Sequence, residues 1–344
     1  MRKPQHKLRR GWTTGACAAA AVKAALTNLW GGGFPDPVTI TLPRGETPSF
    51  PLAHTAAGDG WAEAGITKDA GDDPDVTHGA LVIARVSPAP VGVVFRAGEG
   101  VGTVTKPGLP IPPGEPAINP VPRQMMRQVV EDLAARYGKT ADIVITLSIP
   151  GGAEIATRTW NPRLGIAGGL SILGTTGIVR PFSCAAWIAS IHRGIDVARA
   201  EGLRHVAGCT GATSERAVQA LHRLPDGAML DMGDFVGGML KYLARHPVPR
   251  ITVGGGIAKM AKLAQGAMDL HSGRSRADFA TLSGWVGRDL NGVNTVLEAH
   301  EIAGQKLADE IARRARARCV EVVPEADLDV VVVDRAGKLL AQAS

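Results

Sequence analysis

The second half of the chain repeats one pattern of apolar and polar positions. Short apolar runs such as DIVITLSI, HVAGCTG, RITVGGG and DVVVVD alternate with helical patterns such as SERAVQALHRL and AKMAKLAQGAM. Repetition of strand, small-residue turn and helix predicts a doubly wound sheet with mainly parallel strands. We therefore expect an α/β domain over residues 140–344, with one long amphipathic helix over residues 295–319 before the last strand.

The first part of the chain has a different pattern. After Thr13-Thr14-Gly15, the run ACAAAAVKAALTNLW predicts a helix of small residues capped by one of the two threonines. PVTITLP and GALVIARVSPAPVGVVFRAG alternate as strands do. Residues 101–122 hold too many prolines for a helix or a central strand, and a helix is expected over residues 123–137. The prediction is an α+β domain over residues 1–139 with glycine- and proline-rich loops.

Composition narrows the class of ligand. The formal net charge of +6 suits a polyanion. Nucleic acid is not expected as a partner, because the basic residues are dispersed and only 4% of residues are aromatic. The 43 glycines make up about an eighth of the chain, against a usual ~7%. This excess indicates that at several places the backbone closely approaches another group.

The spacing of the cysteines and the length of the apolar runs indicate the cellular compartment of the protein. The four cysteines form no CxxC pair, so neither a disulfide framework nor a zinc site is indicated. The N-terminus lacks the apolar core of a signal peptide, and no segment approaches the ~20 apolar residues of a membrane span. We expect a cytoplasmic protein with no membrane partner and no metal of its own.

Three turns in the second half have the composition of ligand-binding turns, namely residues 208–214, 231–233 and 254–256. Ligands of parallel sheets lie beyond the carboxyl ends of the strands, where helix N-termini offer unpaired N–H groups. None of the three matches the GxGxxG or GxxxxGK[ST] motifs. The alternative is that the glycines only permit tight turns between strand and helix.

Two polar motifs have simpler interpretations than catalysis. The run KDAGDDPDVTHG carries acidic residues that could hold Mg²⁺ or Ca²⁺, but Ala80 stands where an EF-hand needs Glu, and a solvated turn is the commoner meaning. In His271-Ser272 the two residues are adjacent, so their side chains rarely meet, and the chain has no GxSxG elbow. We expect no hydrolase triad.

Five long motifs occur in an order and spacing similar to those of the cobalt-precorrin-5B C(1)-methyltransferase family, the CbiD proteins. They are LRRGWTTGACAAAAVKAA, KDAGDDPDVTHG, GVGTVTKPGLPIPPGEPAINPVPR, IPGGAEIATRTWNPRLGIAGGLSILGTTGIVRP and GDFVGGML. The resemblance implies an α+β domain joined to a three-layer α/β domain. It also implies transfer of a methyl group from S-adenosylmethionine to C(1) of cobalt-precorrin-5B, giving cobalt-precorrin-6A, with any cobalt carried by the substrate.

The resemblance assigns no catalytic residue, because in-line methyl transfer needs positioning rather than a protein nucleophile. We expect the donor at the strand ends, at Gly208, Thr210, Gly211, Asp231, Gly233, Gly254, Gly255 and Gly256. We expect the tetrapyrrole, with its many carboxylates, at Thr13, Thr14, Gly15, Asp72, Asp73, Lys106, Arg163, Gly169, Ser171, Thr175, Thr176, Gly177, His271 and Ser272. A further hypothesis is that both Thr-Thr-Gly turns face one substrate cleft between the domains.

Several alternatives stay open at this point. The family pattern has a Gly-His-Ile-Gly-Lys turn where this chain has VGGGIAKMAKL, so a metal-free precorrin is also compatible as substrate. A dinucleotide-dependent oxidoreductase would need an acidic residue after the second strand to hold a ribose. A non-catalytic tetrapyrrole carrier would bind the macrocycle but not S-adenosylhomocysteine. A homo-oligomer is compatible with the sequence.

Overall fold

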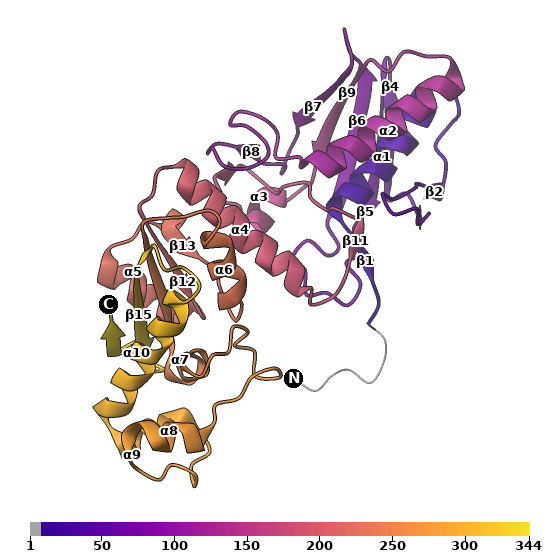
Figure 1. Ribbon diagram of the computed structural model, residues 1–344. Helices are drawn as coiled ribbons and strands as arrows, with labels where there is room; N and C mark the ends of the chain where they lie inside the picture. The colour runs from indigo at the N-terminus through magenta and orange to yellow at the C-terminus, as the bar shows by residue number, and fades with distance from the viewer. Residues whose placement is uncertain (1–7) are drawn as a thin grey trace. The chain divides into compact units, whose positions relative to one another are not determined.

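The computed structural model describes residues 8–344, which form two compact units, one ending at Ser183 and the next beginning at Cys184 (Figure 1). This division differs from the expected boundary after residue 139. The reason is strand β9 (Ile143–Ser148), which pairs with β6 and β7 of the first sheet and so cannot open the second domain. An apolar run in the sequence predicts a strand, but it does not show which sheet the strand joins.

The first unit is built on a five-stranded mixed sheet of order β4-β5-β6-β9-β7. Only β7 and β9 pair in parallel; the other neighbours are antiparallel. The remaining bounds are β4 His54–Gly58, β5 Trp61–Thr67, β6 Leu81–Pro88 and β7 Val93–Ala97.

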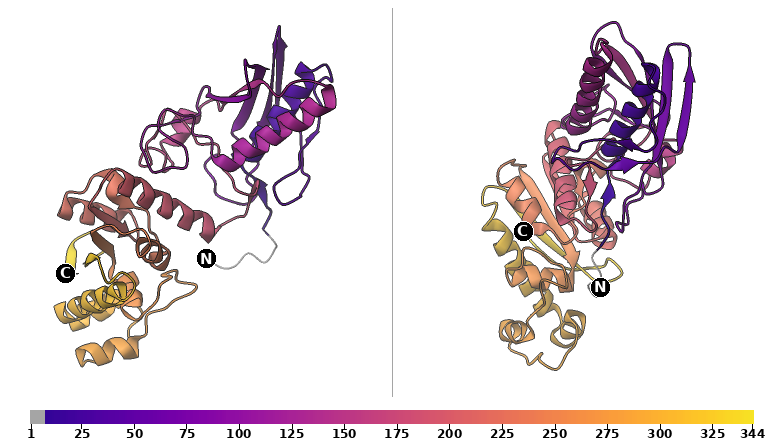
Figure 2. Two further views of the ribbon diagram at one scale, coloured as in Figure 1. Left: turned by 45° about the horizontal axis from the view of Figure 1, so that its top comes forward. Right: turned by 90° about the vertical axis from the view of Figure 1, so that its right-hand side faces the viewer.

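Two helices, α1 (Thr14–Leu29) and α2 (Pro120–Tyr137), cover one face of this sheet (Figures 1 and 2). Helix α1 packs on β5 and β6, and α2 packs on α1. Most residues of α1 are buried, because its alanines let the helix lie close to the sheet. The Thr13 side chain caps it by accepting the Ala16 N–H at 3.2 Å.

Helix α2 begins at Pro120, before its expected start at residue 123. Prolines in the first helical turn lose no hydrogen bond, because those N–H groups have no partner within the helix. The helix ends as expected at Gly138, which has the left-handed φ of 62°.

Short strands complete the first unit in three two-stranded ladders, β1-β11, β8-β10 and β2-β3. Helix α3 (Gly152–Ala156) follows β9. The strands are β1 Gly11–Trp12, β2 Val38–Thr39, β3 Ser49–Phe50, β8 Thr103–Val104, β10 Ile166–Ala167 and β11 Ile178–Val179.

The second unit contains a five-stranded sheet of order β13-β12-β14-β15-β16, in which only β16 is antiparallel. Its strands are β12 His205–Cys209, β13 Met229–Leu230, β14 Arg250–Gly256, β15 Asp327–Val333 and β16 Leu339–Ala343. Its helices are α4 Cys184–Ala200, α5 Ala212–His222, α6 Val236–Leu243, α7 Ile257–Ala264, α8 Phe279–Val286, α9 Val296–Ala303 and α10 Gln305–Val320, with a short 3₁₀ turn, η1, over Asp226–Ala228.

Alternate residues of β15 pack into different cores on the two faces of this sheet. Val330 and Val332 pack in one core with α4, α6, α7 and α10, whereas Val331 and Val333 pack with Val218 of α5. The sheet therefore has helices on both faces, and the prediction of an α+β unit followed by an α/β unit with a mainly parallel sheet is confirmed.

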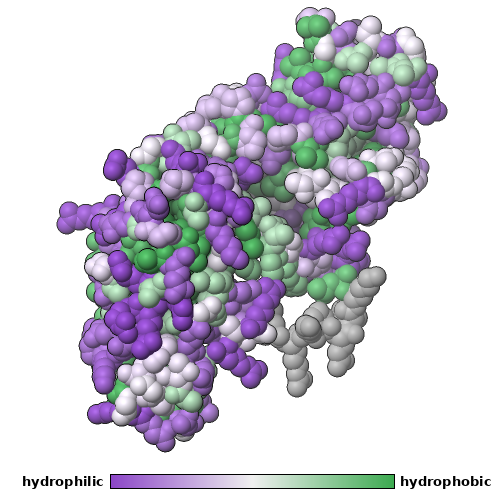
Figure 3. All heavy atoms as spheres, viewed as in Figure 1, coloured by the Kyte–Doolittle hydropathy of each residue, from purple (hydrophilic) through white to green (hydrophobic). Residues whose placement is uncertain are grey.

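The expected single helix over residues 295–319 is wrong. Gly304, with φ 68°, ends α9, and α10 begins at the next residue. Among residues 8–344, no helix combines the length and the apolar character that crossing a bilayer requires. Polar side chains are spread over both units on the face shown in Figure 3.

Candidate functional site

The glycine-rich run GLSILGTTGIVRP lies against the N-terminal Thr13-Thr14-Gly15 turn of the same unit. The Leu173 N–H donates to Thr14 Oγ1 at 3.0 Å, and the Gly15 N–H donates to the Leu173 carbonyl at 3.0 Å. The Thr13 N–H donates to the Gly177 carbonyl, also at 3.0 Å. The structure thus brings the two Thr-Thr-Gly turns together by direct hydrogen bonds.

Glycines of this run are required by close contacts within the chain. A Cβ on Gly174 would lie 2.3 Å from Thr13 Oγ1, and one on Gly169 would lie 2.3 Å from the Gly100 backbone. A Cβ on Gly177 would lie 2.5 Å from a methyl of Leu42. Real Cβ atoms essentially never show contacts this short, so a larger residue would displace the Gly100 backbone or the Thr13 side chain, and at position 177 the end of the Leu42 side chain.

The hydroxyl groups of the run are partly committed to the chain itself. Ser171 Oγ lies 3.4 Å from Asn161 Oδ1, and the Asn161 amide donates to the Gly169 carbonyl at 3.1 Å. Thr176 Oγ1 accepts the backbone N–H two residues later, at 3.3 Å. Thr175 is exposed.

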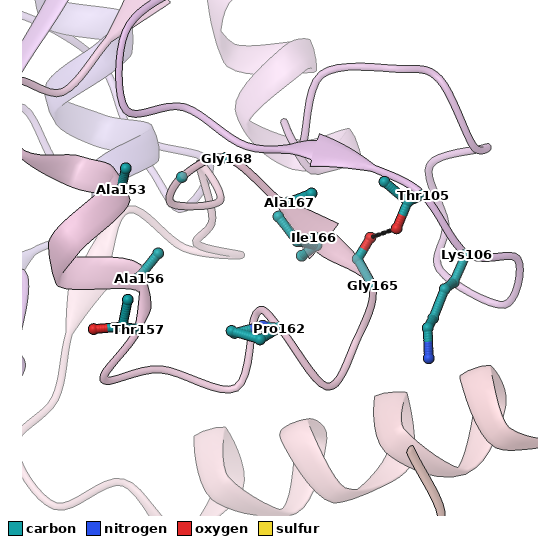
Figure 4. A pocket seen from close by; sticks show the side chains of 11 residues that line it. Thr105, Lys106, Ala153, Ala156, Thr157, Pro162, Gly165, Ile166, Ala167 and Gly168 are labelled. Carbon is teal, nitrogen blue, oxygen red and sulfur yellow. Dashed lines mark hydrogen bonds between the residues drawn. The ribbon is translucent and has the colours of Figure 1, made fainter. Parts of the chain in front are cut away.

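A hollow of about 390 Å³ opens beside this run in the first unit (Figure 4). Its lining consists of small or apolar residues and backbone, with Lys106 as the one charged residue. Both the N–H and the hydroxyl of Thr105 donate to the Gly165 carbonyl, at 2.7 and 2.8 Å. The lining residues are Thr105, Lys106, Ala153, Ala156, Thr157, Pro162, Gly165, Ile166, Ala167, Gly168 and Gly169.

The acidic motif ties the ends of the first unit together. An Asp72 carboxylate oxygen accepts the Arg9 backbone N–H at 2.6 Å, and Asp73 Oδ1 accepts the Phe182 N–H at 2.8 Å. The hydrogen-bonded Arg9 guanidinium holds the pKa of Asp69 below its usual range. Within the described part of the chain, no cluster of three or more His, Cys, Asp or Glu is placed to hold a metal ion.

Three other expected substrate residues, Arg163, His271 and Ser272, are not part of the glycine-rich run. The Arg163 guanidinium stacks on the Trp160 ring at 4.6 Å. His271 and Ser272 belong to the second unit, in an exposed turn where His271 Nδ1 accepts the Gly273 N–H at 3.2 Å. The structure therefore distributes the expected substrate residues over both units.

In the second unit, the carboxyl ends of β12 and β14 lead into helix N-termini that begin with glycine. Gly211 is the N-cap of α5 and Gly256 the N-cap of α7, and a Cβ on either would meet nothing within 4 Å. Lys259 of α7 donates to the Thr210 carbonyl at 3.0 Å and pairs with Asp234 at 2.9 Å. The N–H groups of the first turn of each helix have no partner within that helix, and no other atom lies within 4 Å of a Cβ built on either N-cap glycine.

The remaining strand-end glycines are packed against side chains of their own unit. Each of three positions would place a Cβ within 2.5 Å of a neighbouring side-chain atom, which accounts for a glycine there without a ligand. The pairs are Gly208 with Met239, Gly254 with Val218 and Gly255 with Met260.

Trp187 of α4 belongs to this edge, and sequence reasoning missed it. Its indole Nε1–H donates to the Asp231 carbonyl at 2.8 Å, and its ring would lie 3.3 Å from a Cβ on Gly233, which has φ 55°. Trp187 as a whole residue is 47% exposed. The one available signal was a tryptophan in a chain with few aromatic residues.

Cys209, at the carboxyl end of β12, is buried. Burial raises the pKa of Cys209 to about 12, so a thiolate nucleophile is absent near neutral pH. The edge can bind and orient ligands, but it supplies no covalent intermediate through this sulfur.

Comparison with known proteins identifies the class. Residues 1–181 match the CbiD family, and residues 269–344 match the family described as CbiD, C-terminal domain. The chain belongs to the CbiD family.

Similar proteins are named for one reaction. The chain is 60% identical to the cobalt-precorrin-5B C(1)-methyltransferase of Brucella anthropi, over 99% of this chain and 97% of the relative. It is 60% identical to the protein of the same name from Paramagnetospirillum magneticum, over 98% of this chain and 99% of the relative. A solved structure, the cobalamin biosynthesis protein CbiD of Archaeoglobus fulgidus, matches 86% of this chain and 85% of its own, with 23% identity and a TM-score of 0.42.

Proposed function

We propose that this protein transfers a methyl group from S-adenosylmethionine to C(1) of cobalt-precorrin-5B in cobalamin biosynthesis, giving cobalt-precorrin-6A. The observation that carries the proposal is 60% identity over 99% of the chain to a relative named for this reaction. Because the identity extends over both units, every part of the relative that the reaction needs has a counterpart in this chain.

We propose the carboxyl edge of the parallel sheet as the donor site. The bound donor supplies a sulfonium methyl group as the electrophile. The open N-termini at Gly211 and Gly256 suit its carboxylate, and the exposed Trp187 indole suits stacking on its adenine. Thr210, Asp231 and Gly233 complete the edge, whereas Gly208, Gly254 and Gly255 support it by packing.

We assign the tetrapyrrole to the glycine-rich side of the first unit. Lys106 lines the hollow beside Gly169, and Thr175 is exposed on the run that Thr14 holds in place. The chain has to orient the macrocycle, present C(1) in line with the methyl group and exclude water. Orientation of this kind contributes up to ~7–11 kcal/mol to lowering a barrier, and it needs no nucleophilic residue.

The proposal is tested by mass spectrometry of the corrinoid. The intermediate is generated with the preceding pathway enzymes, with and without cobalt, and incubated with this protein and S-adenosylmethionine. The expected result is a gain of one methyl group that disappears when the donor is omitted. A macrocycle that binds tightly but never gains mass would indicate a carrier and refute the proposal.

The donor assignment has its own test. Trp187→Ala is expected to raise KM for S-adenosylmethionine without changing KM for the tetrapyrrole, because the indole is placed to stack on the donor. The matched control is Trp285→Ala in α8, whose indole stacks on Arg314 at 4.5 Å. Equal effects of the two variants on KM for the donor would refute this assignment.

A further inference from the structure

We propose that Arg10 and Arg180 together bind carboxylate arms of the tetrapyrrole, and that Asp72 and Asp73 are positioning residues that hold the backbone beside the two arginines. The inference rests on the proposed function and adds a pair of binding groups to it. Every residue that carries the inference belongs to the first unit.

The two arginines lie at the same end of the β1-β11 ladder (Figure 1). In this antiparallel ladder Gly11 is opposite Val179, and Arg10 and Arg180 adjoin this pair on the side away from the Thr-Thr-Gly turns. Neighbouring strands lie about 4.8 Å apart. The register therefore brings the backbones of the two arginines together, although the residues are far apart in the sequence.

The positive charges of this pair have no acidic partner in the described part of the chain. Both arginines are exposed, and no hydrogen bond, ion pair or ring contact joins either guanidinium group to another residue among 8–344. Arg9 differs, because its guanidinium pairs with Asp69. Like charges on adjacent strands repel one another, so the pair costs stability in the free protein and favours a bound anion.

The acidic motif fixes the backbone on the outer side of each arginine. On one strand, the Arg9 N–H donates to an Asp72 carboxylate oxygen at 2.6 Å, and the Asp72 N–H donates to the Arg9 carbonyl at 3.1 Å. On the other strand, the N–H of Phe182, which has the left-handed φ of 56°, donates to Asp73 Oδ1 at 2.8 Å. Asp72 and Asp73, expected from the sequence to bind substrate, thus act through the backbone.

Charge and spacing indicate which ligand suits the pair. The methyl donor carries a sulfonium and an ammonium group against one carboxylate, so its net charge is repelled. The tetrapyrrole carries acetate and propionate arms side by side on its rings. Guanidinium groups form bidentate, charge-assisted hydrogen bonds with carboxylates, and two of them on adjacent strands match two neighbouring arms. The pair therefore suits a carboxylate-bearing edge of the tetrapyrrole.

The pair is continuous with the surface assigned to the tetrapyrrole. Arg180 lies three residues after Gly177 of the glycine-rich run, and Arg10 lies three residues before Thr13. At about 3.3 Å per residue, the arginines lie about 10 Å along the ladder from the joined turns. One macrocycle with its arms spans this distance, so the turns and the arginines can contact the same ligand.

Direct binding tests the pair independently of turnover. The probes are cobyrinic acid, whose arms are all free acids, and cobyric acid, in which all but one of them are amides of similar size. Each is titrated by the change in corrin absorbance. Arg10→Gln and Arg180→Gln are each expected to weaken binding of cobyrinic acid about tenfold or more, the loss of one charge-assisted contact, and to leave binding of cobyric acid nearly unchanged.

Stability separates a binding role from a structural one. Because the two charges repel one another in the free protein, removing either is expected to leave the urea midpoint unchanged or to raise it slightly. Arg44→Gln is the matched control, since it removes another exposed arginine of the same unit and is expected to change neither the midpoint nor the affinity. Weaker binding together with a lower midpoint in both Arg10→Gln and Arg180→Gln would indicate a structural role and overturn the binding role.

The positioning role is tested by Asp73→Ala against Asp73→Asn. Asp73→Ala removes the acceptor of the Phe182 N–H, so we expect weaker binding of cobyrinic acid, whereas Asp73→Asn keeps an acceptor oxygen and is expected to retain most of the affinity. A purely electrostatic role predicts tighter binding in both variants, because each loses a negative charge near an anionic ligand. Unchanged or tighter binding in Asp73→Ala would overturn the positioning role.

The outcomes are distinct for the two proposals. In turnover, KM for the tetrapyrrole is expected to rise in both arginine variants with KM for the donor unchanged; a rise in KM for the donor instead overturns the pair. If the wild type methylates its substrate but either arginine variant binds cobyrinic acid as tightly as the wild type, the pair is overturned and the methyltransferase stands. If the wild type fails to methylate yet both variants selectively lose the acid, the pair holds and the proposed function fails. A wild type that does not bind cobyrinic acid overturns the pair.

Discussion

Replacement of Thr14 by Val tests whether the N-terminal turn holds the glycine-rich run in place. Thr14 is 2% exposed, and its hydroxyl both accepts the Leu173 N–H at 3.0 Å and donates to the Leu173 carbonyl at 3.3 Å. Valine has nearly the same shape, so the packing of α1 is preserved while both bonds are lost.

The expected cost comes mainly from one orphaned donor. The Leu173 carbonyl keeps its bond from the Gly15 N–H at 3.0 Å, so only the Leu173 N–H loses its partner. An unsatisfied buried donor costs about 1–3 kcal/mol, and partial burial places this one in the lower part, about 1–2 kcal/mol. For a domain of this size, that corresponds to a decrease in Tm of about 2–8 °C.

The assay combines calorimetry with hydrogen exchange of the Leu173 amide. We expect Thr14→Val to lower Tm and to accelerate exchange at Leu173, with residues of β5 and β6 still protected. Thr14→Ser is the matched control, because it keeps the hydroxyl and loses one methyl, a cost of about 0.8 kcal/mol. Unchanged exchange at Leu173 in Thr14→Val, or equal loss of protection in both variants, would refute the reasoning.

Three further predictions follow from strain, titration and burial. Phe182 and Arg223 have left-handed φ values of 56° and 52°, a conformation that is strained for residues other than glycine. Phe182→Gly and Arg223→Gly are each expected to raise the free energy of unfolding by about 0.5–1 kcal/mol. A lower urea midpoint in both variants would contradict this. Burial, and after it the positive charge of Arg250, lowers the pKa of His205 from 6.5 to about 4. The folded state therefore loses stability as pH falls from about 6.5 toward about 4, because the unfolded chain takes up the proton first. Urea midpoints measured against pH should show this loss in the wild type and a smaller one in His205→Gln. Burial raises the pKa of the Cys209 thiol to about 12, so it should react with a thiol reagent at pH 8 only after unfolding. The partly exposed Cys184 should react in the native state. Mass spectrometry of the labelled peptides distinguishes the two cysteines.

Local pattern predicted the fold well where neighbouring residues determine it. The helix of small residues after Thr13, its cap, and the parallel strands over residues 205–209, 250–256 and 327–333 all follow from spacing and turn chemistry. The domain boundary did not, because β9 pairs with β6 and β7, whose residues come 50 to 65 positions earlier in the sequence. Periodicity records which faces are apolar, but not which sheet a strand joins.

The candidate site shows the same limit at the level of single residues. Gly211 and Gly256 face open space, whereas Gly208 is filled by Met239 from α6. Nothing within a turn distinguishes these cases, because the side chain that fills the space comes from another helix. Trp187 reaches the same edge from α4, more than forty residues before Asp231, and no local motif marks it.

The glycine-rich run explains why sequence alone could not separate ligand contact from chain contact. A backbone that approaches a macrocycle and one that approaches another loop both require the absence of a Cβ. Here the glycines approach Thr13, Gly100 and Leu42 of the same unit. Residues 165–169, which lead into the run, line the hollow. Under the proposed substrate assignment, contacts within the chain and contacts with a ligand are compatible, because a run held in place by its own unit would present a defined surface to a macrocycle.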